Sequence, residues 1–295
     1  MRARLATALL AGIVLATICA AARPLVILYT NDLHVRLSRL ASLREQIERE
    51  RDAGVPVLLV DAGDAWQDFR TPLAAVWGGE RMVDWMNDVG YDAIALGNHE
   101  MYWGADRLAE LAAGASFPIL CANLMPRPDV SPPFVASAVR VVDGLRVLLV
   151  GLITGEHLPY PDFPWLRRVE SAAVLRSTLD AQAEPVDLVV VVGHLPTAEA
   201  AELARAVESI DVFVSGHSHE QTAEPIRAGE TLIVQAGAFG CHLGRLVLNV
   251  KSGDVSLVSN DLIPTTKAPA DVGRGLVQLA AVVLTILATA LVVLL

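Results

Sequence analysis

The sequence predicts an α/β domain over residues 24–259, with mostly buried sheets flanked by helices. Three observations support this fold class. Short apolar runs rich in Val, Ile and Leu have the length and composition of buried strands. Segments between them place apolar residues three and four positions apart, as amphipathic helices do. Turns that contain Gly or Pro separate the two kinds of segment, and no internal repeat interrupts them.

In the first half of the domain, we expect four strands with a helix between each consecutive pair. The strands are residues 25–29, 57–60, 93–96 and 119–121. The helices are marked by apolar residues at helical spacing, namely Leu37, Leu40, Leu43 and Ile47, then Met82, Val83, Trp85 and Met86, then Leu108 and Leu111. Glu45 and Glu48 occupy the other face of the first helix, which indicates a helix that packs on a sheet and faces solvent.

The second half begins with a predicted β-hairpin, because the strand-like residues 135–142 and 147–150 flank the turn Asp143-Gly144. Helices and strands then alternate, at residues 171–181, 186–192, 197–207 and 212–214. Three short strands close the domain, at residues 232–236, 246–250 and 255–258. The middle of the domain is therefore expected to be antiparallel.

Both ends of the chain are apolar, which accounts for part of the 53% hydrophobic composition. Residues 1–22 contain Arg2 and Arg4, an uncharged run, and then small alanines, the pattern of a secretory signal peptide. An uncleaved membrane anchor is the alternative. The folded domain is then expected over residues 23–263, on the exported side of a membrane.

The 21 residues 275–295 carry no charge. At about 1.5 Å per helical residue they would span about 30 Å, the thickness of a hydrocarbon core, so we predict a C-terminal transmembrane helix. The removable tail of a glycolipid-anchor signal is the alternative. Residues 264–274, rich in Thr, Pro and Ala, are expected to form a stalk between domain and membrane.

The net charge of -10 argues against a nucleic-acid polymer as partner, because such binding relies on clustered Lys and Arg. No obligate protein partner is predicted. Cys121 and Cys241 would remain after removal of the signal peptide, and an exported chain permits their pairing. The sequence alone does not place them within bonding distance, so no disulfide is predicted.

Five predicted strands each end in polar side chains that can bind metals. The motifs are Asp32-Leu33-His34, Asp61-Ala62-Gly63-Asp64, Gly97-Asn98-His99-Glu100, Gly193-His194 and Gly216-His217-Ser218-His219. They contain five of the seven histidines of the chain. Adjacent imidazole, amide and carboxylate groups are costly to bury without partners, so these motifs indicate a shared site at the carboxyl ends of the strands.

The donor types indicate divalent metals. In an extended segment alternate side chains point the same way, so Asp32 with His34, and His217 with His219, are each expected to hold one ion together. Oxygen and nitrogen donors without thiolates suit Zn, Mn or Fe. Seven candidate ligands exceed the needs of one ion: Asp32, His34, Asp64, Asn98, His194, His217 and His219. Two ions that share a bridging carboxylate fit this number better.

In order and spacing, these motifs resemble those of the calcineurin-like metallophosphoesterases. Four longer phrases are similar to the 5'-nucleotidase branch: Tyr29-Thr30-Asn31-Asp32-Leu33-His34, Asp61-Ala62-Gly63-Asp64, Ala122-Asn123-Leu124 and Gln235-Ala236-Gly237-Ala238-Phe239-Gly240. The resemblance covers residues 24–260. It implies a two-sheet β-sandwich flanked by helices, the four-layer metallophosphoesterase fold, with its site on loops at one edge.

The resemblance also implies roles for the site residues. Asp32, His34, Asp64 and His219 would bind the first metal, and Asp64, Asn98, His194 and His217 the second. Asp64 would bridge the ions, which are Mn, Zn, Fe, Co or Mg. His99 would be the catalytic histidine that assists the leaving group, and the substrate a small phosphorylated molecule.

The chain departs from the branch in three respects. Tyr102 stands where an Asp usually orients the catalytic histidine, so the tuning of His99 is open. Val35 stands where Gly is frequent. We also expect no second domain of comparable size before residue 275, and that domain usually supplies the nucleotide-binding residues. Nucleotide specificity is therefore not carried over with the metal site.

Several residues outside the ligand set remain candidates. His157 and His242 are expected on the surface or in packing, although His242 could line the mouth of the site. Trp66, Phe69, Tyr102 and Trp103 either stack on a substrate or cover the sheets, and Arg36 and Arg70 either contact phosphate or are solvated. Taken together, these features predict an exported, membrane-anchored phosphomonoesterase. A phosphodiesterase for cyclic nucleotides or lipid head groups, and a non-catalytic surface binding protein, are the alternatives.

Overall fold

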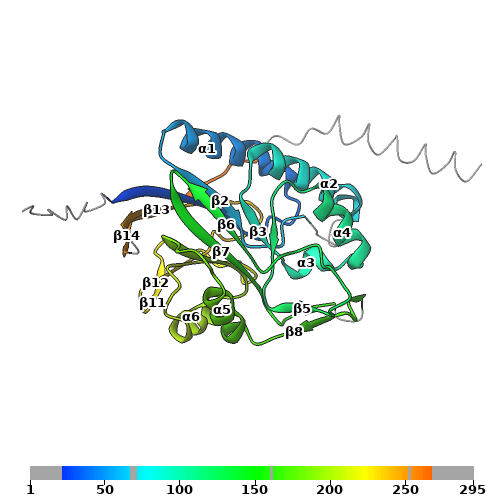
Figure 1. Cartoon of the computed structure of the whole chain (residues 1–295). Coiled ribbons are helices and arrows are strands. Elements are labelled where there is room, and N and C mark those ends of the chain that lie inside the picture. Colours follow the sequence, from blue (N-terminus) through cyan, green and yellow to red (C-terminus); the bar gives the residue numbers. More distant parts are fainter. Residues whose placement is uncertain (1–21, 67–71, 160–161, 252–253, 268–295) are drawn as a thin grey trace, which may run out of the picture.

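The computed structural model describes residues 22–66, 72–159, 162–251 and 254–267. In these ranges two six-stranded sheets pack face to face, and helices cover both outer surfaces. Figure 1 shows α1, α2 and α4 on one side of the sheets and α5 and α6 on the other. The prediction of a four-layer α/β sandwich is confirmed.

The first sheet has the strand order β14-β13-β1-β2-β3-β4. Its strands are β1 (Arg23–Thr30), β2 (Val57–Asp61), β3 (Ala93–Ala95), β4 (Ile119–Leu120), β13 (His242–Lys251) and β14 (Asp254–Pro264). Strands β1 to β4 are parallel, and β13 and β14 add an antiparallel hairpin. The helices on this side are η1 (Leu37–Arg39), α1 (Leu40–Asp52), α2 (Pro72–Val89), α3 (Asn98–Met101) and α4 (Gly104–Gly114).

The second sheet has the strand order β11-β12-β10-β9-β7-β6. Its strands are β6 (Ser137–Val142), β7 (Leu145–Ile153), β9 (Leu188–His194), β10 (Val212–Ser215), β11 (Ile226–Ala228) and β12 (Thr231–Val234). Helices α5 (Ser171–Asp180) and α6 (Thr197–Ala206) pack on its outer face. The hairpin β6–β7 lies at the predicted turn, and β7, β9, β10 and β12 are parallel.

Strand β1 shows how the sequence separates the layers. Leu25, Ile27 and Tyr29 face the second sheet, whereas Val26 and Leu28 pack with the helices. Because successive side chains of a strand point to opposite faces, a continuously apolar run is what a strand buried on both faces requires. The cluster between the sheets also takes Val190 and Val192 from β9.

Some elements differ from the sequence-based expectation. A small sheet of β5 (Leu124–Pro126) and β8 (Leu166–Arg168) was not predicted, because these segments include Pro126 or arginines and form no apolar run. Strand β14 continues past residue 258 to Pro264, because it pairs with β13 along this length, although its consecutive polar residues 259–261 give no apolar signal in the sequence. Thr265, assigned to the stalk, accepts hydrogen bonds from Arg39 and donates its N–H to the Cys241 carbonyl, so the folded domain includes it.

The described part of the chain contains no helix that is both long and apolar enough to cross a membrane. The predicted signal peptide (residues 1–22) lies outside the described residues except for its last position, and the predicted transmembrane helix (residues 275–295) lies wholly outside them. Cys121 and Cys241 are both free thiols.

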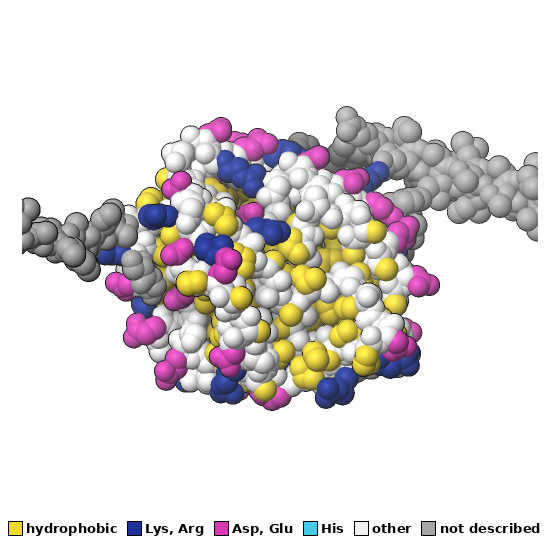
Figure 2. All heavy atoms as spheres, viewed as in Figure 1, with side chains coloured by type: hydrophobic (Ala, Val, Ile, Leu, Met, Phe, Trp, Pro, Cys, Tyr) yellow, Lys and Arg dark blue, Asp and Glu magenta, His cyan; other side chains and the backbone are white. Residues whose placement is uncertain are grey.

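The face of the molecule shown in Figure 2 has acidic and basic side chains interspersed. Hydrophobic side chains gather over the region of β5 and β8, where Met125 is 45% exposed. Among the described residues, this face presents no continuous basic surface of the kind that binds a nucleic-acid backbone.

Candidate metal centre

The carboxyl ends of parallel strands from both sheets meet at one edge of the sandwich. In the first sheet Thr30 pairs with Asp61 and Asp61 with Ile94, so β1, β2 and β3 end level with one another. In the second sheet Ser215 of β10 pairs with Gly193 of β9. Each of the five motifs follows or ends one of these strands, and the sheet register therefore brings them together.

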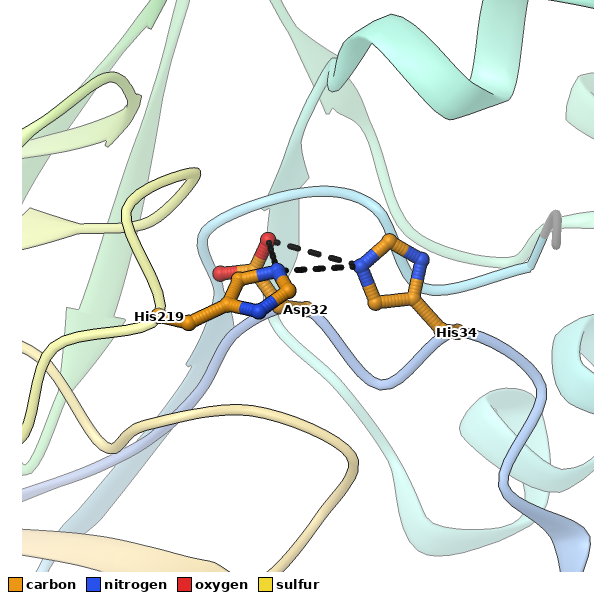
Figure 3. A group of neighbouring side chains, drawn as sticks. All are labelled: Asp32, His34 and His219. Atoms are coloured by element: carbon orange, nitrogen blue, oxygen red, sulfur yellow. Dashed lines mark hydrogen bonds and ion pairs between the residues drawn. The ribbon is translucent and has the colours of Figure 1, made fainter.

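Asp32, His34 and His219 form the first cluster, shown in Figure 3. The Asp32 Oδ1 atom lies 3.2 Å from His219 Nε2 and 3.7 Å from His34 Nε2, and the two histidine nitrogens are 3.3 Å apart. Asp32 Oδ1 is buried and accepts no hydrogen bond. Its other oxygen accepts hydrogen bonds from the Asn31 side chain and the His217 N–H. One buried oxygen therefore remains available to a cation.

Asn98, His194 and His217 form the second cluster. His194 Nε2 lies 3.1 Å from Asn98 Oδ1 and 3.3 Å from His217 Nδ1. The other ring nitrogens of the histidines have partners outside the cluster. His194 Nδ1 is 2.8 Å from the carbonyl oxygen of Ala62, and His217 Nε2 is 3.2 Å from a carboxylate oxygen of Glu156. An N–H donated to each of these oxygens leaves the inward nitrogen as an acceptor, as a metal ligand requires.

Asp64 lies between the two clusters. Its Oδ2 atom is 3.2 Å from His194 Nε2 on one side and 3.9 Å from His34 Nε2 on the other. His99 Nε2 is 3.7 Å from the same oxygen, and the His99 N–H donates to Asp64 Oδ1. These distances alone would also admit His99 as a ligand, so geometry does not separate its role from those of the other histidines.

The backbone of the site corrects one expectation. Asp32, His34, Asp64, His217 and His219 all have positive φ angles, between 47° and 71°. The paired residues therefore do not alternate along an extended segment. Left-handed turns bring Asp32 to His34 and place His217 and His219 in different clusters. Such φ angles are uncommon outside glycine and concentrate at functional sites.

Glu100, which was not in the predicted ligand set, holds the loop that carries Asp64. Its buried carboxylate accepts the backbone N–H groups of Asp64, Ala65, Trp66 and Gly97. The spacing of an acid three residues after Gly97, as in a helix cap, was the signal for this role. Gly97 itself has no room for a side chain, since an added Cβ would lie 2.2 Å from Asp64 Oδ1.

The charged groups of the site shift one another's pKa values. Burial opposes the charged form of Asp64, but His194, His99 and His34 outweigh it and hold the pKa of Asp64 well below its usual range. Burial likewise opposes protonation of His194, yet the carboxylates of Asp64 and Asp32 raise its pKa to about 10. For His34, burial prevails over the same two carboxylates and lowers the pKa to about 4. His34 and His194 therefore differ in protonation near neutral pH.

The clusters open into a cavity of about 360 Å³. Its described walls are His34, Asp64, Asn98, His99, Tyr102, His157, His217 and His219. His157 thus belongs to the site, where the sequence suggested surface or packing, because its loop lies beside His217. His242 is not among the described lining residues.

Some of the aromatic and basic residues that the sequence offered as substrate contacts lie in the core, and others lie near the site. Trp66 is fully buried in the core, and Trp103 is 47% exposed outside the described cavity wall. Phe239 belongs to the motif Gln235-Ala236-Gly237-Ala238-Phe239-Gly240, from which the sequence predicted no role for it. Its ring packs against both His34 and His219. Arg36 lies 4.7 Å above the Phe239 ring. Phe69 and Arg70 lie outside the described residues.

Residues 25–221 match the family described as calcineurin-like phosphoesterase. The chain belongs to this family. The predicted family, and the enzyme class of phosphoester hydrolases at the level of the family, are thereby confirmed. Within the match lie all seven predicted ligands and His99.

Relatives of this calcineurin-like phosphoesterase include 5'-nucleotidases. The chain is 30% identical to a 5'-nucleotidase of Mus musculus, over 85% of this chain and 51% of that protein. It is 29% identical to a 5'-nucleotidase of Vibrio parahaemolyticus, over 81% and 50%. The solved structure of a 5'-nucleotidase precursor from Thermus thermophilus superposes with a TM-score of 0.76 at 26% identity, covering 87% of this chain and 58% of that one. The chain spans about half the length of the curated relatives it matches.

The residues present in this calcineurin-like phosphoesterase fit divalent metals. Every inward-facing donor is a carboxylate or amide oxygen or an imidazole nitrogen. Asp32 Oδ1 is buried without a hydrogen bond, and the ring nitrogens of His34 and His219 approach each other closely. A cation placed among these atoms would satisfy all three.

Proposed function

We propose that the chain is an exported, membrane-anchored phosphomonoesterase with two divalent metal ions, and that 5'-nucleotides are the first substrates to test. The observation that carries the proposal is the position of Asp64. A single carboxylate oxygen lies within 3.9 Å of a histidine from each cluster, as a ligand shared by two ions would. Neither cluster alone offers enough donors for a closed site, so the shared carboxylate accounts for both.

The proposed ligand sets follow the two clusters. The first ion would be held by Asp32, His34, Asp64 and His219, and the second by Asp64, Asn98, His194 and His217. When bound, such a pair supplies an activated water and neutralises charge on the phosphoryl oxygens. The protein's part is to orient the donors, through Glu100 beneath the Asp64 loop and Phe239 behind the histidines of the first cluster.

His99 is proposed to assist the leaving group. Its side chain is on the cavity wall, and its backbone N–H is fixed to Asp64 Oδ1 at 2.8 Å. The ring packs between His34 and Tyr102, with centroids 4.6 and 4.8 Å away. An imidazole held this way can donate a proton to a departing alkoxide while its position relative to the ligands stays constant.

The size and walls of the cavity favour a small phosphorylated substrate. A volume of about 360 Å³ lies at the lower end of the range for small-molecule sites. Tyr102 and His157 provide ring surface beside the donors, which suits an organic group attached to the phosphate. The relatives named as 5'-nucleotidases make nucleoside monophosphates the appropriate first panel.

The test is a panel of phosphomonoesters and phosphodiesters, assayed with the full chain after loading with Mn or Zn and again with a chelator. Chelator-sensitive release of phosphate from monoesters supports the proposal. Preferential cleavage of cyclic nucleotides or lipid-like diesters would replace it with a phosphodiesterase. Ligand binding without turnover would indicate a binding protein.

The proposed location rests on the sequence at both ends, which lies outside the described residues. Uncharged residues 275–295 would hold the domain on the outer side after cleavage of residues 1–22. Cutting the chain after Lys267 keeps the bonds of Thr265 to Arg39 and should release an active domain. A truncated domain that still sediments with membranes would contradict the anchor.

A further inference from the structure

Tyr102 occupies a position from which it can act on the second cluster. It directly follows α3 and lies four residues after Asn98, so both side chains are on the same side of this helical turn. Its side chain lines the cavity, and its hydroxyl lies against the Asn98 side chain. Tyr102 is therefore a direct neighbour of one of the proposed ligands.

The phenol is hydrogen bonded to the Asn98 side chain. Asn98 Nδ2 donates to Tyr102 Oη at 2.9 Å, while Asn98 Oδ1 points to His194 Nε2 at 3.1 Å. The two ends of an amide have opposite roles, since only the oxygen can bind a cation. A phenolic oxygen that accepts from the NH2 end holds the oxygen end toward the second cluster.

The ring of Tyr102 makes a separate contact. Its centroid lies 4.8 Å from that of His99, at an interplanar angle of 59°. Removing the hydroxyl alone therefore leaves the packing on His99 in place. This separation allows the effect on Asn98 to be measured without disturbing the proposed catalytic histidine.

We infer that Tyr102 is a positioning residue that sets the Asn98 amide for the second metal ion. The inference rests on the proposed binuclear site. It assigns this position a function different from orienting His99, the role that a carboxylate there would have. Loss of the phenolic oxygen permits the amide to rotate and present its NH2 group, which has no lone pair for a cation.

The test is Tyr102→Phe in the full chain, stripped of metal and titrated with Mn or Zn by calorimetry. Groups that orient a ligand from outside typically change metal affinity by about 10- to 100-fold. We expect the second ion to bind about tenfold more weakly and the first ion to bind as in the wild type. Trp103→Phe, a change at the exposed neighbouring residue, is the matched control and should leave both affinities unchanged.

A double-mutant cycle with Asn98→Asp separates positioning from general stability. A carboxylate presents an oxygen in either orientation, so Tyr102→Phe should weaken the second ion far less in that background. Equal weakening in both backgrounds, or unchanged binding in Tyr102→Phe, would overturn the inference. A wild-type protein that binds fewer than two ions would instead contradict the proposed function.

Discussion

The two clusters reach similar donor geometry by different local means. In the first cluster Asp32, His34 and His219 all lie in left-handed loop backbone. In the second, His217 is also in left-handed backbone, but His194 is the last residue of strand β9 and Asn98 the first of helix α3. A left-handed turn can direct the side chains of nearby residues toward one point. A strand or helix instead directs a side chain through the position of its terminal residue. Motifs that look alike in the sequence are therefore held in place by two different kinds of backbone structure.

The clusters also differ in charge. Burial lowers the pKa of His34 to about 4, so it is neutral near pH 7. His194 is also buried, but the carboxylates of Asp64 and Asp32 outweigh burial and raise its pKa to about 10. Without metal, His194 therefore carries an extra proton near pH 7, whereas His34 does not. A cation must displace that proton to bind.

The largest expected effect is at Asp64, which lies between the two clusters and contacts histidines of both. Asp64→Asn removes the charge that both ions are proposed to use, so we expect activity to be lost and metal content to fall below two ions per chain. Elemental analysis and phosphate release measure the two effects. Asp92→Asn, a partly buried carboxylate that bonds the Leu59 N–H away from the site, is the control. Retention of two ions in Asp64→Asn would refute the bridge.

His99 tests whether a histidine beside the first cluster is a ligand or a catalyst. As a proton donor it should matter most for poor leaving groups, so His99→Asn should slow alkyl phosphates by about 10² to 10⁴ and aryl phosphates much less. Metal content should stay the same. Equal losses on both ester classes would mean that His99 positions the phosphate, and loss of an ion would make it a ligand.

The proton on His194 makes metal binding at the second cluster depend on pH. Because His194 must lose one proton, the affinity of the second ion should rise about tenfold per pH unit between about pH 7 and pH 9. His34, already neutral, adds no proton release for the first ion. Calorimetry in buffers of different ionisation enthalpy measures the protons released. Release of none on filling both sites would contradict the raised pKa of His194.

The smallest expected effect concerns the outer partner of His217. Glu156 is 66% exposed, and exposed ion pairs contribute about 0–1 kcal/mol, so Glu156→Gln should weaken the second ion by less than about fivefold. The first ion should be unaffected. Glu202→Gln on α6 is a control of equal charge change. A much larger loss would show that Glu156 is essential to how His217 is held.

The sequence predicted which polar side chains lie together better than it predicted what holds them in place. Strand ends and donor types identified the seven candidate ligands, because polar groups that follow buried apolar runs are costly unless they bind something. The left-handed turns at Asp32 and His219 were missed because Asp and His tolerate a positive φ but do not require it. The spacing of Glu100 after Gly97 marks a helix cap, but its bond to the Asp64 N–H depends on a contact across the chain, as does the place of His157, and a motif does not contain such contacts. The fold was accessible because the buried strands, even the short β3 and β4, lie in apolar runs, whereas β5 and β8 contain Pro126, Arg167 and Arg168 and form no such run.

The side chains of the first cluster come from opposite sheets, since Asp32 and His34 follow β1 and His219 follows β10. His34 and His219 are 185 positions apart in the sequence. An ion held between them acts as a cross-link that closes a very long loop, much as a disulfide would. Folding must bring the two halves of the chain together before any ion can be gripped, and a bound ion then opposes their separation by mass action. An ion bound at this cluster would therefore also stabilise the packing of the two sheets against each other.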